Sequence, residues 1–134
     1  MEITGREVDN LRNYLDRGGF IVVDDFRGGR ALSNFELQLK KVFPDRSFVL
    51  FDVTHPIFDS YYRFDRLDLD PAYGREQIAL YALIDDDDRI QVSVNQNDDL
   101  GEYWEWTDRG DRPLKTSAES HQKGINSLIY AMTH

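Results

Sequence analysis

The sequence predicts an α/β fold, because capped helical stripes alternate with short, unbroken apolar runs along the first half of the chain. Thr4 and Glu7 form a T-x-x-E capping box ahead of apolar residues at helical spacing, which predicts a helix ending at about Arg17. Two glycines stop this helix, and the apolar run that follows them is typical of a strand buried on both faces. We therefore expect a central parallel strand over Phe20–Val23.

A second helix and a second strand follow in the same order. Ser33 and Glu36 repeat the capping box, an apolar stripe follows them, and Pro44 ends the helix. The next hydrophobic run, Ser47–Val53, has the character of a strand. The order helix, strand, helix, strand describes a right-handed crossover unit that joins two parallel strands.

The second half of the chain adds a hairpin and a closing helix. The β-like runs Ile78–Ile84 and Ile90–Val94 are joined by four aspartates, which predicts an antiparallel hairpin with an acidic turn. Residues Ser117–Met132 predict a helix in which Gly124 permits close approach to the sheet. We expect its inner face to carry His121, Ile125, Leu128, Ile129 and Met132.

Length and composition set the class of protein. The 134 residues fit one α/β domain over residues 1–134, and the apolar content of 40% supports a packed core. The formal charge of -9 disfavours nucleic acid and anionic lipid as partners. The absence of cysteine excludes disulfides, thiolate metal sites and a cysteine nucleophile. No apolar run approaches the roughly 18 residues that span a bilayer, and no export signal is visible, so the bare chain indicates the cytoplasm.

The expected sheet is small for its class, because the chain opens with a helix and shows two strands of parallel type. Either a partner subunit supplies neighbouring strands, or the hairpin completes a small sheet, or the chain is the C-terminal portion of a larger domain. The first of these alternatives implies a homo-oligomer that assembles through an exposed sheet edge.

Four segments of the chain resemble, in the same order, the bacterial domain of unknown function 4159. They are LRNYLDRGGFIVVDDF (Leu11–Phe26), FPDRSFVLFDVTHPIF (Phe43–Phe58), NDDLGEYWEW (Asn97–Trp106) and GINSLIYAMTH (Gly124–His134). The resemblance implies a flavodoxin-like, three-layer sandwich similar to class I glutamine amidotransferases, with a partly parallel sheet. It also implies upstream strands that this chain lacks, and a setting in the bacterial cell envelope. It implies no activity, and glutaminase chemistry needs a cysteine that is absent.

Polar side chains cluster where the predicted parallel strands end. Asp24 and Asp25 directly follow the first strand, and His55 follows the second. Because open α/β sheets place ligands at the carboxyl ends of their strands, these groups are candidates for a cation site or for acid–base catalysis. The alternative is structural, with the aspartates capping a loop and Pro56 holding His55 in a turn.

The segment Asn95–Trp106 is the other candidate for a binding surface. Asn97 and Asp98 would join Asp24, Asp25 and His55 if the strand ends share one rim. The alternating oxygen ligands are similar to a calcium loop, but the sixth position is Leu100 and the twelfth is Trp106, so we assign no metal and no cofactor.

Three aromatic residues close this segment: Tyr103, Trp104 and Trp106. They are either a stacking platform for a sugar or aromatic ligand or part of the core. In an extended segment the two tryptophans would share one face.

The sequence therefore predicts a non-catalytic module that binds an unknown small molecule or protein. The main alternative is a metal-assisted or acid–base hydrolase in which His55 works with Asp24 or Asp25. A third hypothesis is an assembly module that uses an exposed sheet edge.

Overall fold

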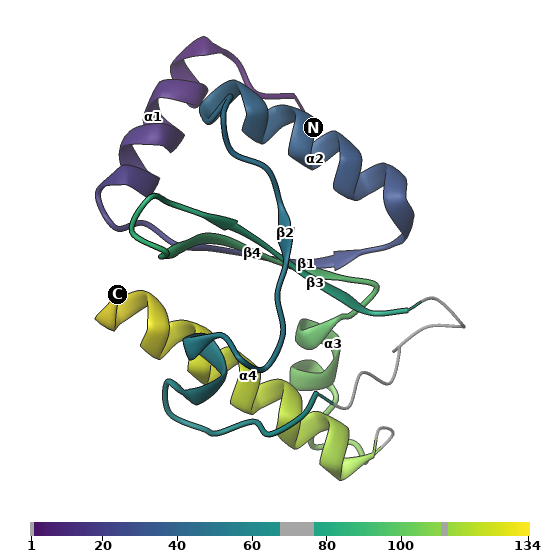
Figure 1. Cartoon of the computed structure of the whole chain (residues 1–134). Helices are drawn as coiled ribbons and strands as arrows, with labels where there is room; N and C mark the ends of the chain where they lie inside the picture. Colours follow the sequence, from purple (N-terminus) through teal and green to yellow (C-terminus); the bar gives the residue numbers. More distant parts are fainter. Residues whose placement is uncertain (1, 68–76, 111–112) are drawn as a thin grey trace.

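A computed structural model describes residues 2–67, 77–110 and 113–134. It is a mixed α/β structure in which a four-stranded sheet has α1 and α2 on one face and α3 and α4 on the other (Figure 1). The elements in chain order are α1 (Gly5–Asp16), β1 (Ile21–Phe26), α2 (Gly28–Val42), β2 (Val49–Leu50), the 3-10 helix η1 (Pro56–Asp59), β3 (Ala79–Ile84), β4 (Ile90–Gln96), α3 (Leu100–Glu105) and α4 (Leu114–Thr133).

The strands are ordered β1-β4-β3-β2 across the sheet. β1 pairs with β4 in parallel, whereas β4 with β3 and β3 with β2 are antiparallel. β1, β4 and β2 therefore run in one direction and β3 in the other, so the partly parallel sheet is confirmed. The prediction that the first strand is central is wrong: among the described strands β1 lies at an edge, because it pairs with the hairpin strand β4 on one side and with none on the other.

The first helix and the hairpin are confirmed. The Thr4 N–H and hydroxyl both donate to Glu7 Oε2, at 2.8 and 2.7 Å, and α1 begins at the next residue. In the turn between β3 and β4, the Asp85 carboxylate accepts from the Asp87 and Arg89 N–H groups. The Arg89 guanidinium also donates to the carbonyls of Leu15 and Gly19, at 2.7 and 3.1 Å, and so fastens the end of α1 to the hairpin.

Two boundaries differ from the prediction. α2 begins at Gly28, not at Ser33, because the end of β4 holds Gly28 from both sides. Asn97 Oδ1 accepts from the Gly28 N–H at 2.9 Å, and Gln96 Nε2 donates to the Gly28 carbonyl at 3.2 Å. The predicted strand over residues 47–53 shortens to Val49–Leu50, which pairs with β3 at the edge opposite β1.

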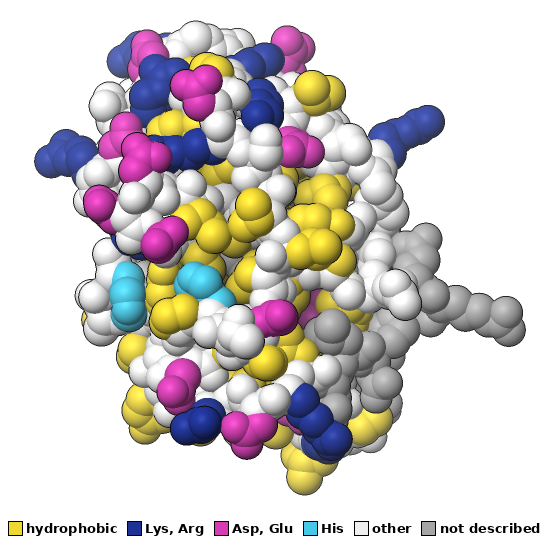
Figure 2. Space-filling view, in the orientation of Figure 1, with side chains coloured by type: hydrophobic (Ala, Val, Ile, Leu, Met, Phe, Trp, Pro, Cys, Tyr) yellow, Lys and Arg dark blue, Asp and Glu magenta, His cyan; other side chains and the backbone are white. Residues whose placement is uncertain are grey.

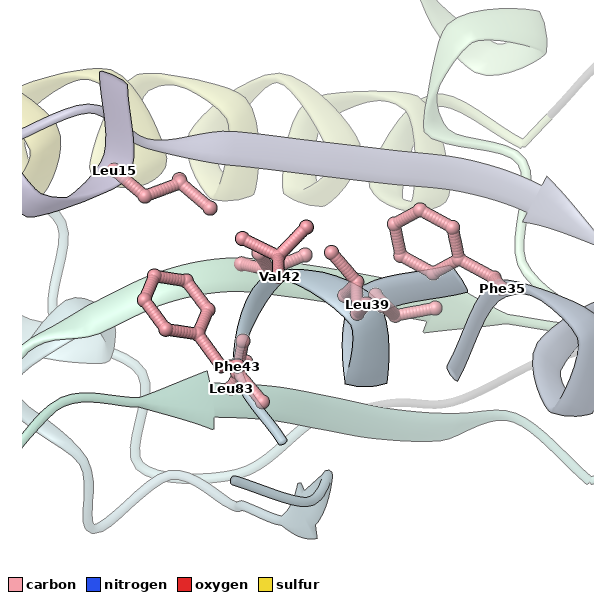
Figure 3. Close-up of a cluster of buried hydrophobic side chains, with 8 residues drawn as sticks. Leu15, Phe35, Leu39, Val42, Phe43 and Leu83 are labelled. Atoms are coloured by element: carbon pink, nitrogen blue, oxygen red, sulfur yellow. The ribbon is translucent and has the colours of Figure 1, made fainter. Parts of the chain in front are cut away.

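A hydrophobic core lies between the sheet and the helix pair α1 and α2. Figure 3 shows Leu15 of α1 facing Leu39 and Val42 of α2, with Phe35, Phe43 and Leu83 around them. Val92 and Val94 of β4 complete this cluster and are fully buried. Core aliphatic side chains of this kind each stabilise the fold by about 1.5–3 kcal/mol through burial.

The inner face of α4 is polar, which contradicts the predicted apolar face. Ser117, Ser120, Asn126 and Tyr130 are its buried residues, whereas Leu128 and Met132 are 60% and 73% exposed. The reason is that α4 binds backbone groups of its neighbours. Ser120 Oγ donates to the Leu100 carbonyl, and the Asn126 amide bonds to both the N–H and the carbonyl of Tyr62. The Tyr130 hydroxyl accepts from the Ile90 N–H.

No helix in the described ranges combines the length and the apolar character that crossing a membrane requires.

Candidate functional site

Four of the predicted site residues meet at the carboxyl end of the parallel pair β1 and β4. The Asp25 N–H donates to the Asp98 carbonyl at 3.1 Å, and the Asn97 N–H donates to the Phe26 carbonyl at 2.7 Å. Asp24 is close enough to Asp98 for the two carboxylates to repel each other. The expected convergence of the first strand end with the NQNDDLG segment is therefore observed.

Asn97 and Asp25 stabilise the backbone at this strand end. Both have left-handed backbone conformations, with φ of 60° and 58°. The Asn97 amide bridges Gly28 and Gln77, accepting from the first N–H and donating to the second carbonyl, at 2.9 and 2.8 Å. Asp25 forms an exposed ion pair with Arg27 at 2.9 Å. Asn97 therefore binds backbone groups on both sides of the strand end, whereas the Asp25 carboxylate contacts an arginine side chain and not the backbone N–H groups of the following loop.

The Asp24 carboxylate anchors the first turn of α3. Its Oδ2 accepts from the Gly101 N–H at 2.9 Å, and its Oδ1 accepts from Asn95 Nδ2 at 3.4 Å. Burial raises the pKa of Asp24, the bonds from the α3 backbone and Asn95 oppose this, and the Asp98 charge adds to the rise. With the Asp99 side chain capping Glu102 N–H at 2.8 Å, Asp24 fixes where α3 and its aromatic residues lie.

Asp98 and Lys123 form a buried ion pair between the sheet and α4. Asp98 Oδ2 lies 3.6 Å from Lys123 Nζ, and the two side chains are 4% and 12% exposed. Asp98 Oδ1 accepts from the Asp99 N–H, whereas Oδ2 is buried without a hydrogen-bond partner among the described residues. Lys123 also lines a void of about 20 Å³ with the polar residues Ser93, Asn95 and Asn126. The space is too small for an organic ligand.

His55 does not join the other predicted residues. Its ring contacts that of Tyr130 with centroids 5.6 Å apart, and Tyr130 binds Ile90, the first residue of β4. Asn97 follows the last residue of β4, so His55 lies at the opposite end of a strand about 20 Å long. The expectation that His55 meets Asp24 and Asp25 is wrong, because β2 ends early and the chain turns away into η1.

His55 instead caps η1 and lines a polar hollow that includes His134. His55 Nδ1 accepts from the Ile57 N–H at 3.2 Å, which assigns the neutral ring's proton to Nε2. Burial lowers the pKa of His55, and the nearby His134 lowers it further. Figure 2 shows histidine side chains gathered on this face of the molecule, beside hydrophobic side chains.

The three aromatic residues occupy a helix and its cap rather than an extended segment. Tyr103 points inward and is 6% exposed, whereas Trp104 is 42% exposed. The Trp104 ring lies against Gly124 of α4, where a Cβ would stand 2.5 Å from its Cζ2, and it stacks near His121. Gly124 therefore permits close approach of the Trp104 ring, and not the close approach of α4 to the sheet that the sequence predicts. Trp106 is covered by the Arg109 guanidinium, 3.9 Å from the ring centroid.

Trp104 borders a groove of about 860 Å³ along the open side of β1, which we call the edge groove. Phe20, just before β1, and Val22 of β1 form its floor, and the 43% exposure of Val22 shows how open this floor is. Leu100 and Trp104 of α3 close one end, and Gly18 and Gly19 lie at the other.

The walls of the edge groove are two helical stripes. Asn10, Asn13, Tyr14 and Arg17 come from α1 and its cap, and Gly124, Ser127, Leu128 and Ala131 come from α4. Of these eight residues, sequence reasoning singled out only Gly124 and Leu128, and it placed both against the core. The spacing of Asn10, Asn13 and Arg17 is a detectable signal, because residues three and four apart share a helix face.

Of three comparisons with known proteins, the one with protein families found a match. Searches among curated proteins and among solved structures found no match. The family model described as "Domain of unknown function (DUF4159)" matches residues 1–132. The match covers nearly the whole chain and not only a C-terminal portion, which corrects that part of the expectation. The chain therefore belongs to the family of domain of unknown function 4159.

Proposed function

We propose that this domain is a non-catalytic binding module that holds its ligand in the edge groove. The observation that carries the proposal is the groove itself, about 860 Å³ of space beside a half-exposed indole. This volume lies within the range of roughly 300–1,000 Å³ that is usual for ligand sites. Apolar groups at Val22, Leu128 and Trp104 give such a ligand a surface to bury, and backbone and amide groups give it hydrogen bonds.

The non-catalytic part of the proposal is supported by how the candidate acid–base groups are used. Asp24 binds the backbone of α3, and Asn97 binds the backbone of Gly28 and Gln77. Asp98 is buried against Lys123. The hydrolase hypothesis needs His55 beside Asp24 or Asp25, and the length of β4 separates them. A small molecule or a protein segment both fit the groove, while the charge of -9 disfavours nucleic acid.

Assembly through a sheet edge is the second candidate function. β1 is open on one side, and at the other edge Val49 and Leu50 are 46% and 69% exposed. Figure 2 shows hydrophobic side chains gathered across the middle of the face on which β2 lies in Figure 1. Sedimentation analysis tests this candidate, because a monomer at high concentration contradicts it.

Fluorescence of the two indoles tests the binding proposal. Trp106→Phe leaves Trp104 as the single tryptophan, and the matched variant Trp104→Phe leaves Trp106, which does not line the groove. Each variant is titrated with a library of apolar and aromatic fragments. We expect hits that change the emission of Trp104 and leave that of Trp106 unchanged. Hits that change only Trp106, or both equally, contradict a site in the edge groove.

We also infer that the fold is related to the class I glutamine amidotransferase-like sandwich. What supports this is the pair of helices on each face and the crossover from β1 through α2 to β2, two strands that run in the same direction. An experimental structure of a longer family member tests it. Extra strands beside β1 support the inference, and strands added only beside β2 contradict it.

A further inference from the structure

We propose that the ligand of the edge groove is an extended peptide with an acidic group, which pairs with β1 as a fifth strand. This inference rests on the proposed binding function and goes further by naming the ligand and how it is held. Peptides that add a strand to a sheet gain affinity from backbone hydrogen bonds and specificity from alternate side chains.

The backbone of β1 offers hydrogen-bonding groups to such a strand. In an extended chain the N–H and C=O of one residue point to one side, and those of the next residue point to the other. The Asp25 N–H points to the β4 side, where it donates to the Asp98 carbonyl. Phe20 points to the open side, because its N–H and C=O both bond to the Tyr14 hydroxyl, at 3.3 and 3.0 Å. By this alternation Val22, between them, also presents its N–H and C=O to the open side.

Tyr14 limits the pairing site at one end. Its hydroxyl occupies the edge groups of Phe20 in the way that a neighbouring strand would, although no strand of the described residues lies there. At the other end the left-handed backbone of Asp25 interrupts the register between β1 and β4. The open length is therefore the four residues 21–24, about 13 Å, and a strand of four or more residues covers it.

The walls suit a peptide whose side chains alternate in character. On the α1 side, Asn10, Asn13 and Arg17 have no side-chain hydrogen-bond partner within the described part of the chain, so their donors and acceptors are available. On the α4 side, Leu128 is 60% exposed next to the Trp104 ring. One face of an added strand would thus meet amides and a guanidinium, and the other face would meet apolar groups.

The positive charge in the groove is the reason for proposing an acidic group on the peptide. Arg17 is the one charged side chain among the described residues that line the groove, and it forms no ion pair with any of them. The chain as a whole carries a charge of -9. A cationic peptide would gain from the protein as a whole but would meet Arg17 in the groove, so local complementarity favours a carboxylate at that end.

The walls also indicate a lone strand rather than the edge of a second copy. Residues of both α1 and α4 line the space beside β1, so both helices border the path to its edge. The β1 edge of another copy carries the same two helices, and these would meet the walls before the two strands approached to about 4.8 Å. A peptide without flanking helices has no such obstacle.

The test uses fluorescein-labelled heptapeptides of alternating threonine and valine, with either a free or an amidated C-terminus, followed by anisotropy at low salt. The central variant is Val22→Pro, because proline removes an N–H and is tolerated on an edge strand when that N–H faces solvent. Its matched control is Val22→Thr, which keeps the N–H and the shape. We expect Val22→Pro to weaken binding about tenfold and Val22→Thr to leave it within about twofold. We expect the free carboxylate to bind about threefold more tightly than the amide, and Arg17→Gln to remove this difference.

Hydrogen exchange of the Val22 amide provides a second measurement that needs no variant. Protection of this amide by the peptide, together with the loss in Val22→Pro, supports strand addition. Binding that Trp104→Phe weakens but Val22→Pro does not would overturn strand addition while leaving the edge groove as a binding site. Failure of every peptide to bind, with fragments still changing Trp104 emission, overturns the peptide ligand alone. Peptide-dependent dimerisation, or self-association abolished by Val22→Pro, points to a second copy and overturns the lone strand.

Discussion

Replacing Gly124 by alanine should change the stability of this protein in opposite directions depending on residue 104. A Cβ at Gly124 would lie 2.5 Å from Trp104 Cζ2 and 3.1 Å from Cη2, so the indole must move. Gly124 lies inside the 20-residue helix α4, where alanine is favoured over glycine by about 1 kcal/mol. The steric cost and the helix propensity therefore oppose each other at one site.

The exposed fraction of Trp104 sets the size of the steric cost. The side chain is 42% exposed, so a tryptophan that can bury 150–250 Å² keeps about 90–145 Å² out of water here. At about 25 cal/mol per Å², complete displacement of the ring costs about 2–3.5 kcal/mol. After the gain in helix propensity, we expect Gly124→Ala to lower the free energy of unfolding by about 1–2.5 kcal/mol. With Trp104→Ala present, the same change should raise it by about 1 kcal/mol.

Urea unfolding of the wild type, both single variants and the double variant measures this cycle. Far-UV circular dichroism serves as the probe, because the indole signal itself is altered. A red shift of Trp104 emission in Gly124→Ala, measured with Trp106→Phe present, would show that the ring has moved toward water. If Gly124→Ala has the same sign in both backgrounds, the close packing of Trp104 on α4 is refuted.

Three further predictions concern groups at the two ends of the sheet. Lys123→Met should lower the free energy of unfolding by about 3–5 kcal/mol, because it leaves Asp98 buried and unpaired. Adding Asp98→Asn should recover most of this loss. Both changes are measured by urea unfolding, and the absence of any recovery would contradict the pairing. Asn97→Ala should be about 1 kcal/mol less stable than Asn97→Gly, because φ is 60°, and equal stabilities would exclude strain there. The pKa of His55 lies below 6.5 in the folded state, so the unfolded state binds more protons as pH falls. Stability should then drop below about pH 6.5, and His55→Gln should flatten this part of the profile.

Elements whose signals are local could be predicted from the sequence. The capping box of Thr4 and Glu7 and the acidic turn around Asp85 depend on residues within four positions of one another, and both form as expected. The second capping box fails although its pattern is the same. Ser33 lies inside α2, because the contact of Asn97 with Gly28 starts the helix earlier, and that contact joins residues 69 positions apart.

The inner face of α4 could not be predicted from hydrophobic periodicity. Leu128 and Met132 have the spacing of a buried stripe, yet the helix turns Asn126 and Tyr130 inward. Each of these two polar groups binds backbone atoms of another segment, at Tyr62 and Ile90. Leaving these three backbone groups unpaired would cost about 1–3 kcal/mol each, whereas exposing Leu128 and Met132 forgoes about 1.5–3 kcal/mol each, so the larger number of backbone groups favours the polar inner face.

Strand order explains why part of the predicted site forms at one end of the sheet while His55 lies elsewhere. The fourth strand of the chain inserts beside the first, so Asn97 and Asp98 come to lie next to Asp24 and Asp25. The same insertion moves β2 to the far edge of the sheet and leaves one side of β1 uncovered. A sequence read in chain order gives no sign of this, because the parallel pairing of β1 with β4 joins segments about 70 residues apart. The open side of β1 arises from this arrangement, and together with the outward-facing Leu128 of α4 it forms the groove to which the proposed function is assigned.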